Sequence, residues 1–361
     1  MARNAEAVGE NTYGFDAIRG VQAGKEFFVV ICPLNIVGKM FHNVEYEISP
    51  KERAQRTLNQ SRIPVIVKYM LDNPKEYIFS SLTAAVDGNM SFEPAPHLGP
   101  DGKIGRLTID MGARFLLNDG QHRKHAIDEA LKERPELRSE SISIMFVKDK
   151  ELKRCQQMFA DLNKNAMKPS KSLNILYDQR DEFSQFVVEL TETVEAFKNR
   201  VNLEKTSIGA GDTDAFTLNG VLDATKKFLG KTKIKEITDE EKQLAEKFWN
   251  TLSDILPEWQ HLIKKSMKPK EIRDAFVNTN TNCLNALGLV GRVIRETYPD
   301  DWAKKLTKLR KIDWSRTNPL WVGNLMQDGK LVRTTVGIEM GADAILKECG
   351  IANRVKKRRK K

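Results

Sequence analysis

The chain has 361 residues, of which 40% are apolar and 30% charged, and its formal net charge is +10. No apolar run approaches the roughly 18 residues that a membrane helix needs, and the apolar runs near the start are strand-sized. The composition therefore predicts a soluble globular protein in the cytoplasm, without a membrane partner. The four cysteines are scattered and form no CxxC pair, which argues against a disulfide framework and against a cysteine zinc site.

The positive charge is concentrated at the C-terminus. Residues 1–180 carry 26 basic and 23 acidic side chains, residues 181–353 carry 26 of each, and residues 354–361 carry seven basic ones and no acidic one. Such a run is disordered on its own and suits a polyanion, with salt-sensitive, sequence-independent affinity. The alternative is a solubilising end. We expect contacts with double-stranded DNA from Arg354, Lys356, Lys357, Arg358, Arg359, Lys360 and Lys361.

Strand and helix signals are mixed in the first 150 residues. The polar, turn-rich residues 1–15 are predicted to be a loose lead-in. Apolar, β-branched and aromatic runs predict strands at 26–32, 77–86, 107–110, 115–118 and 141–147. A capping box at Ser49 predicts a helix over 50–60, and an amphipathic pattern predicts another over 64–71.

From residue 151 the pattern is almost wholly helical. Apolar periodicity predicts helices over 152–163, 172–201, 218–228, 240–256, 270–296 and 300–309, with a short strand or hairpin at 331–338. The predicted fold class is therefore α+β. A mixed sheet-and-helix domain (1–150) precedes a helical domain (151–353) and a basic, disordered tail (354–361).

The most distinctive stretch surrounds Asp119–Gly120. An apolar run ends at this turn signal, and Ala126, Ile127 and Ala130 then follow at the spacing of one helix face. The same face, extended back by four residues, carries His122 and Arg123. Because a helix N-terminus offers backbone N–H groups without intrahelical acceptors, this strand–turn–helix junction is the best candidate for an anion site.

The residue types at this junction suit phosphate chemistry. Gly120 permits a tight turn and close ligand approach, Arg123 offers planar bidentate donors, and His122 can donate to the same anion or shuttle a proton. The Asp119 carboxylate can accept a hydrogen bond from the backbone of the turn or from His122. The alternative is a hydrogen-bonded helix cap with a satisfied histidine. No metal is assigned, because His122 and His125 lack further ligands at a recognisable spacing.

A second candidate is the loop that contains Asn163, Lys164, Asn165 and Lys168. A loop rich in asparagine and lysine can close over a nucleotide or DNA phosphate, although a solvated connector with asparagine caps explains it equally well. If the loop faces the motif helix, Arg123, Lys164 and Lys168 form one anion pocket with that helix. The chain has no Walker A, dinucleotide GxGxxG, GxSxG or HExxH motif.

These residues resemble a known family. The sequence Asp-Gly-Gln-His-Arg at 119–123 matches the DGQHR motif that names a group of bacterial proteins. The runs 115–126 and 158–174, with the opening 15–24, are similar to the DndB family, which accompanies the genes of DNA phosphorothioate (sulfur) modification. The resemblance implies a DNA-binding transcriptional repressor of the modification operon, rather than an enzyme that installs sulfur.

The motif also resembles the ParB/sulfiredoxin-like fold, in which a similarly placed Gly…Arg turn binds nucleotide phosphates. That likeness implies Gly120, His122 and Arg123 as phosphate contacts, supported by Asp119 and Gln121. Here Gln-His-Arg stands where ParB has Glu-Arg-Arg.

Two functions therefore remain open. In the first, the protein represses its own operon by binding promoter DNA, and the pocket either senses a ligand, with ATP or another nucleotide as the candidates, or contacts the DNA backbone. In the second, it is a nucleotide-hydrolysing accessory of DNA modification or defence, with Asp119 and His122 as the catalytic pair. Expected partners are the operon's promoter DNA and other DNA sulfur-modification proteins. The residues do not decide whether the protein forms a homo-oligomer.

Overall fold

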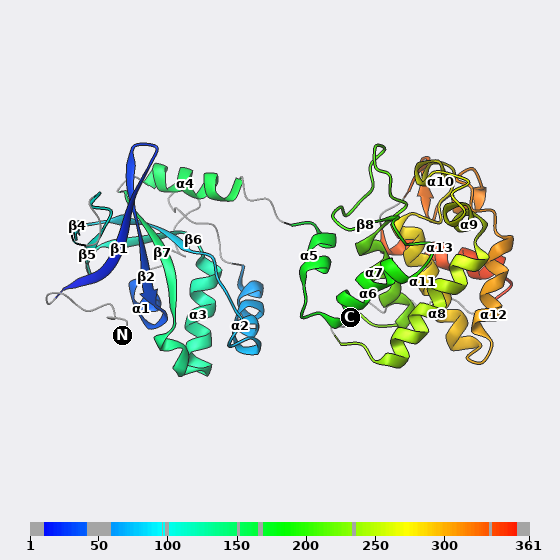
Figure 1. Ribbon diagram of the computed structural model, residues 1–361, viewed down its shortest axis with the longest axis horizontal. Coiled ribbons are helices and arrows are strands. Elements are labelled where there is room, and N and C mark those ends of the chain that lie inside the picture. Colours follow the sequence, from blue (N-terminus) through cyan, green and yellow to red (C-terminus); the bar gives the residue numbers. More distant parts are fainter. Residues whose placement is uncertain are drawn as a thin grey trace. The chain divides into compact units, whose positions relative to one another are not determined.

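The computed structural model describes residues 11–41, 59–95, 97, 101–149, 152–164, 169–232, 236–331 and 334–351. The chain divides into two compact units, Met1–Met167 and Lys168–Lys361. A mixed sheet dominates the first unit and helices dominate the second (Figure 1), so the predicted α+β class is confirmed. None of the helices among these residues is long and apolar enough to cross a membrane.

The first unit is built on a seven-stranded sheet. Neighbouring strands are antiparallel, except that β7 and β3 run parallel. The strands, in spatial order, are β4 (Met90–Pro94), β5 (Ile104–Asp110), β1 (Thr12–Gln22), β2 (Lys25–Pro33), β7 (Ser141–Lys148), β3 (Leu82–Asp87) and β6 (Arg114–Asp119).

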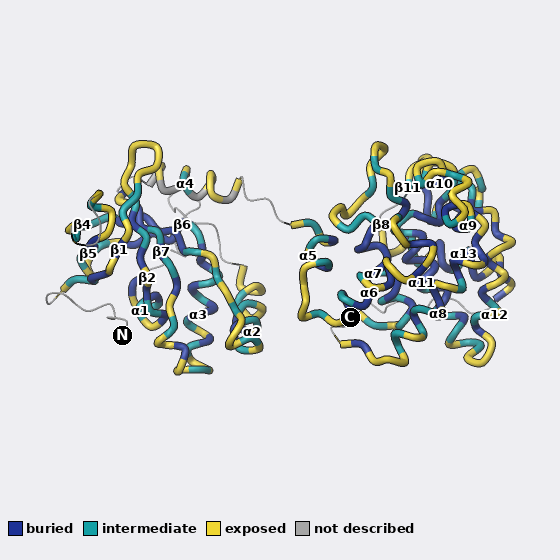
Figure 2. The backbone as a smooth tube through the Cα atoms, viewed as in Figure 1, coloured by how far each residue is buried: buried dark blue, intermediate teal, exposed yellow. Residues whose placement is uncertain are grey.

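The two faces of this sheet are covered differently. One face forms the core with α1 (Leu34–Met40), α2 (Ile63–Asp72) and α3 (Gln121–Glu133), where Ile144 and Phe146 of β7 pack with Ile127 of α3. Because side chains alternate along a strand, Met145 and Val147 lie on the other face. There α4 (Leu152–Lys164) packs on β6. The described residues of α4 are more exposed than those of α3 (Figure 2).

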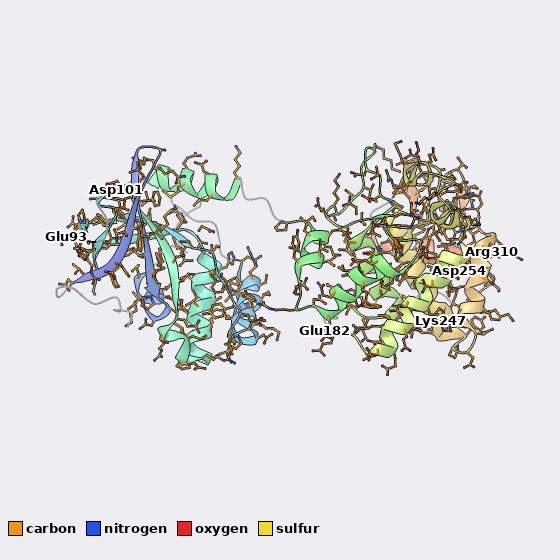
Figure 3. The ribbon with its side chains drawn as sticks, viewed as in Figure 1. Glu93, Asp101, Glu182, Lys247, Asp254 and Arg310 are labelled. Atoms are coloured by element: carbon orange, nitrogen blue, oxygen red, sulfur yellow. The ribbon has the colours of Figure 1, made fainter. Side chains whose placement is uncertain are left out.

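The second unit is a helical assembly around buried aromatic side chains, among them Trp249, Trp259 and Phe197. Charged side chains such as Lys247, Asp254 and Arg310 are exposed on its outside (Figure 3). Its helices are α5 (Lys171–Tyr177), α6 (Glu182–Thr193), α7 (Leu218–Leu229), α8 (Asp239–Ile255), α9 (Pro257–Ile263), α10 (Pro269–Ala275), α11 (Thr281–Thr297), α12 (Trp302–Leu306) and α13 (Thr335–Glu348).

Short strand pairs and 3-10 turns complete both units. The second unit contains the parallel pair β8 (Val201–Asn202) and β9 (Phe216–Thr217) and the hairpin β10 (Met326–Gln327) and β11 (Lys330–Leu331). The 3-10 turns are η1 (Gln60–Arg62), η3 (Pro135–Ser139), η4 (Thr307–Lys311) and η5 (Pro319–Trp321).

Several predicted elements are corrected. The helix predicted over 172–201 is two helices, because the Asp181 carboxylate accepts a hydrogen bond from the Ser184 N–H and starts α6 afresh. Asn280 likewise starts α11 within the predicted helix 270–296. The predicted lead-in 1–15 overlaps β1, which begins at Thr12, and β3 begins at Leu82 rather than at residue 77. Residues 335–338 belong to α13, not to a strand. The helix predicted over 50–60 lies almost wholly outside the described residues.

Candidate functional site

The Asp119–Gly120 turn joins the end of β6 to the start of α3 (Figure 1). Gly120 has a φ of 102°, which is in the left-handed region. A Cβ atom at this position would also overlap Cδ2 of Leu82 on the neighbouring strand β3. Glycine is therefore required both by the backbone conformation and by the close approach of β3.

A side-chain hydrogen bond and a bulge position the end of β6. The pairing of β3 with β6 shifts register between Thr83 and Ala84. Beside this irregularity, Oδ1 of the buried Asn118 accepts a hydrogen bond from the Ala85 N–H at 2.9 Å. Bulges often redirect a strand next to a functional site. Here the bulge and the Asn118 amide fix the position from which the turn departs.

Arg123 holds the turn to the segment that leads into β3. Its Nη2 lies 2.6 Å from Oδ2 of Asp119, one helical turn away. Its Nη1 donates to the carbonyl oxygen of Ser80, to the Ser80 hydroxyl at 2.5 Å and to the Ser81 carbonyl at 3.1 Å. The Arg123 side chain is only 15% exposed. Its guanidinium is thus engaged by the protein, and its charge is balanced by Asp119.

His122 connects the start of α3 to the start of η1. Its Nε2 accepts a hydrogen bond from the Asn59 N–H at 3.2 Å. Asn59 in turn accepts from the Ser61 N–H and caps η1. His122 therefore helps to place η1 and α2 beside the turn.

Two polar side chains of the first turn are buried more deeply than His122 and Arg123. Lys124 is 6% exposed and its Nζ lies 2.8 Å from Oδ2 of Asp128, which satisfies its charge. Gln121 is 8% exposed, and its Nε2 has no hydrogen-bond partner within the described ranges. A buried amide donor without an acceptor is costly, which makes Gln121 the clearest sign of a missing acceptor at this turn.

The start of α3 itself is suited to an acceptor or an anion. Within the described residues no side chain caps the helix, and no acidic residue lies in its first turn. The first intrahelical hydrogen bond runs from the Lys124 N–H to the Gly120 carbonyl at 2.9 Å. The N–H groups of residues 121–123 precede it and have no acceptor within the helix, and the helix dipole adds a positive partial charge there. The arrangement can bind a phosphate oxygen without using the charge of Arg123.

Of the other predicted site residues, only the Lys164 side chain lies within the part of the chain that the structure describes. Lys164 is exposed at the end of α4. Asn163 precedes Lys164 in the same helix, and its side chain is outside the described set, as are Asn165 and Lys168. The seven basic residues predicted to contact DNA (Arg354, Lys356, Lys357, Arg358, Arg359, Lys360 and Lys361) also lie outside the described residues.

Sequence reasoning placed Gln121 among the supports and did not single out Lys124. Both are buried although their residue types favour solvent. The helical spacing could have predicted the burial of Lys124, because this residue lies three positions before Ile127 on the core face of the helix. Nothing in the local pattern indicated the unpartnered amide of Gln121. Within the parts of the chain that the structure describes, no three His, Cys, Asp or Glu side chains are grouped as metal ligands would be.

Comparisons with known proteins assign the family. No curated protein and no solved structure matches the chain significantly. The predicted likeness to the ParB/sulfiredoxin-like fold therefore stays a prediction. A family model named DndB, described as DNA-sulfur modification-associated, matches residues 15–352. This match spans both compact units and includes the turn at 119–123, so the chain belongs to the DndB family of proteins associated with DNA sulfur modification.

Proposed function

We propose that the protein is a DNA-binding repressor of a DNA sulfur modification operon, and that the turn at 119–123 binds the phosphate of a nucleotide. Family membership supports the link to DNA sulfur modification. The seven basic residues in 354–361 support DNA binding, because such a run attracts the phosphate backbone irrespective of sequence. ATP is the first nucleotide to test.

The buried amide of Gln121 carries the nucleotide part of this proposal. Among the residues that the structure describes, its Nε2 is a donor without an acceptor, at a helix start that has neither a side-chain cap nor an acidic residue. A phosphate oxygen would satisfy the amide and interact favourably with the helix dipole. Gly120 permits the left-handed turn that places this helix start, and it leaves room for Leu82 of β3.

The proposed roles of the charged residues follow from their contacts. Arg123 and Asp119 hold each other, and Arg123 also binds Ser80 and Ser81, so both act by positioning the turn. His122 accepts a hydrogen bond from the Asn59 N–H through Nε2 and so joins α3 to η1. Asn163, Lys164, Asn165 and Lys168 remain the proposed contacts from the second loop. The proposal is binding rather than hydrolysis, because Asp119 and His122 are engaged in holding the fold.

The nucleotide site is tested by isothermal titration calorimetry of the full chain with ATP. Gln121→Glu keeps the shape of the side chain but places a negative charge at the phosphate. We expect ATP affinity to fall at least about tenfold, which corresponds to 1.4 kcal/mol. Gln179→Glu, at an exposed position of the second unit, is the matched control and should bind ATP as the parent does. Unchanged affinity in Gln121→Glu would remove the start of α3 from the site.

The repressor role is tested by gel-shift titration. A fragment of the operon's own promoter and a scrambled fragment of equal length are compared at one salt concentration. Tighter binding to the promoter supports the repressor. Equal binding to both fragments, together with ATP turnover that Asp119→Asn abolishes, would instead establish the hydrolysing accessory.

A further inference from the structure

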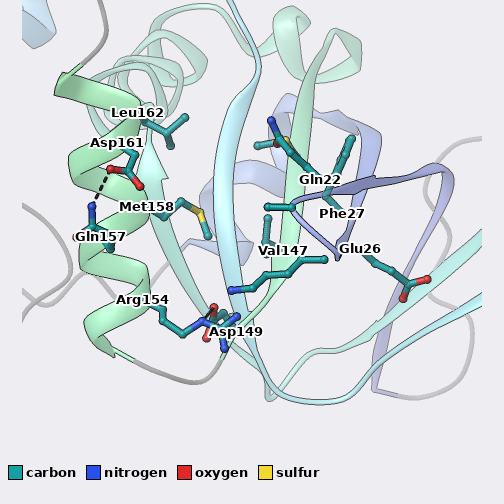
Figure 4. A pocket seen from close by; sticks show the side chains of 13 residues that line it. Gln22, Glu26, Phe27, Val147, Asp149, Arg154, Gln157, Met158, Asp161 and Leu162 are labelled. Carbon is teal, nitrogen blue, oxygen red and sulfur yellow. Dashed lines mark hydrogen bonds and ion pairs between the residues drawn. The ribbon is translucent and has the colours of Figure 1, made fainter.

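A cavity of about 500 Å³ lies between the sheet of the first unit and α4 (Figure 4). It is bordered by the β1–β2 hairpin around Gln22–Lys25, by β7 and by α4, and it is partly open to solvent. Its lining includes Met145 and Val147, which face away from the core that packs against α3. The cavity is therefore on the opposite face of the sheet from α3. Its volume is in the range of small-molecule sites, about 300–1,000 Å³.

The floor of the cavity is formed by apolar side chains of the sheet. Phe27 of β2 pairs in register with Val147 of β7 and with Gly20 of β1. The far end of the Phe27 ring lies over Gly20, where any Cβ atom would overlap the ring. The aromatic ring thus extends across two strands, and Met145 continues the apolar surface along β7. Such a surface suits a planar ring, which can stack on Phe27 and contact the polarizable methionine sulfur.

The wall opposite this floor is also apolar and is open to solvent. Met158 and Leu162, one turn apart on α4, line the cavity and extend toward the sheet in Figure 4. Leu162 is 39% exposed, although it is one of the larger apolar residues of α4. The helix packs on β6, and the cavity lies between it and the β2–β7 part of the sheet. A ligand that fills the cavity would remove this apolar surface from water.

The polar lining shows which charge the ligand should carry. Three carboxylates (Glu26, Asp149 and Asp161) and two cations (Lys25 and Arg154) line the cavity. Arg154 Nε lies 3.0 Å from Asp149 Oδ2, and the Gln157 amide donates to Asp161 at 2.7 Å. Glu26 is also paired with Arg19, whose Nη1 lies 3.3 Å from its Oε1, so the three carboxylates are matched by three cations and the lining favours an uncharged ligand. Carboxylate and amide oxygens accept hydrogen bonds from amino and hydroxyl groups.

We propose that this cavity binds a planar heteroaromatic small molecule without negative charge, of the nucleoside class. The ring lies between the Phe27–Met145 floor and the Met158–Leu162 wall. The amino and hydroxyl groups of the ligand meet the carboxylates and amides of the lining. This site is separate from the turn at 119–123, which is suited to a phosphate, and the inference does not depend on the function proposed above.

The test is calorimetric titration of the full chain with adenosine, guanosine, cytidine and thymidine, and with AMP as the anionic counterpart of adenosine. We expect at least one nucleoside to bind, and adenosine to bind more tightly than AMP. Leu162→Glu places a carboxylate in the apolar wall at an already exposed position, and should weaken nucleoside binding at least about tenfold. Met111→Glu, at an equally exposed apolar residue outside the cavity, is the matched control.

Each result decides the proposal. Loss of nucleoside binding in Leu162→Glu, with retention in Met111→Glu, supports it. Phe27→Ala should also lose binding, since it removes the stacking surface, and its thermal unfolding curve shows whether the fold is intact. If none of the four nucleosides binds the parent protein, or if Leu162→Glu binds as the parent does, the proposal is wrong. AMP binding that is tighter than adenosine binding and that Leu162→Glu weakens would overturn the charge argument, whereas AMP binding that Leu162→Glu leaves unchanged belongs to the turn at 119–123.

Discussion

Arg123 and Asp119 of the DGQHR sequence bind each other, with Nη2 of the arginine 2.6 Å from Oδ2 of the aspartate. The pair spans the first turn of α3, and the same guanidinium reaches back to Ser80 and Ser81. The two formally charged residues of the motif therefore balance each other. What the turn offers to a ligand is a helix start and an amide rather than a free positive charge.

Arg123→Ala should destabilise the first unit. The substitution removes hydrogen bonds to Ser80 and Ser81 and leaves Asp119 without its ion pair. Hydrogen bonds to charged groups contribute about 1.5–3 kcal/mol when buried. Because Asp119 is 45% exposed and partly screened by water, we expect a loss near the lower end, about 1.5 kcal/mol. Urea unfolding measures it. Arg123→Lys keeps the charge but not the planar fork of donors, so it should recover only part of the lost free energy of unfolding. An unchanged urea midpoint in Arg123→Ala would contradict the positioning role.

Gly120→Ala should lower the free energy of unfolding by more than the addition of one methyl group usually does. The left-handed conformation alone costs a non-glycine residue about 1–2 kcal/mol, and the new methyl group would overlap Leu82. Gly112→Ala is the matched control, because nothing lies within 4 Å of its Cβ position. The control should shift stability by no more than about 0.5 kcal/mol. Equal unfolding midpoints for the two variants would show that the turn adapts.

Deletion of residues 354–361 should weaken DNA binding about equally for every sequence. Each phosphate contact contributes about 0.9 to the slope of log affinity against log salt. Removing seven basic side chains should therefore lower that slope as well as the affinity. Filter-binding titrations of promoter and scrambled DNA over a series of salt concentrations measure both. A loss restricted to the promoter would assign sequence selection, not general attraction, to these residues.

Glu258→Gln should stabilise the second unit at neutral pH. Burial raises the pKa of Glu258, although a hydrogen bond from Nδ2 of Asn278 at 2.8 Å partly opposes this. A carboxyl whose pKa is raised by folding favours the folded state only while it is protonated, so its contribution is lost as the pH rises through that pKa. The glutamine stays neutral, and its amide can donate to the otherwise unpartnered Oδ1 of Asn278.

The measurement for this variant is the free energy of unfolding as a function of pH. The gain from Glu258→Gln should be largest at pH 7 and should shrink below about pH 4, where the carboxyl is protonated in both folded and unfolded chains. A variant that is less stable than the parent at pH 7 would mean that the charged carboxylate is stabilised more by Asn278 than it is penalised by burial.

The sequence predicted the local framework of the site well. The Asn-Asp-Gly signal after an apolar run predicted the turn between β6 and α3, and the helical spacing of Ala126, Ile127 and Ala130 predicted its core face. These predictions succeed because the turn and the helix face depend on residues that are close together in the sequence. The contacts of Arg123 could not be predicted in this way, because Ser80 and Ser81 lie 43 and 42 residues earlier in the chain.

The wrong element boundaries have a related cause. Apolar spacing continues across Asp181 and Asn280, so periodicity alone joins helices that these caps separate. In β1 only Phe15 and Ala17 are buried hydrophobic residues, and the strand is therefore hard to distinguish from a polar lead-in. Burial of Gln121 depends on how α3 meets the sheet, which no local pattern contains.

The position of α4 has a thermodynamic consequence. This helix lines the cavity, packs on the strand that ends at Asp119, and is the last helix of the first unit. A molecule in the cavity therefore contacts α4, which also packs on β6, the strand that leads to the turn. Linkage is reciprocal, so any coupling free energy by which cavity occupancy alters affinity at the turn must appear equally as an effect of the turn's ligand on affinity in the cavity.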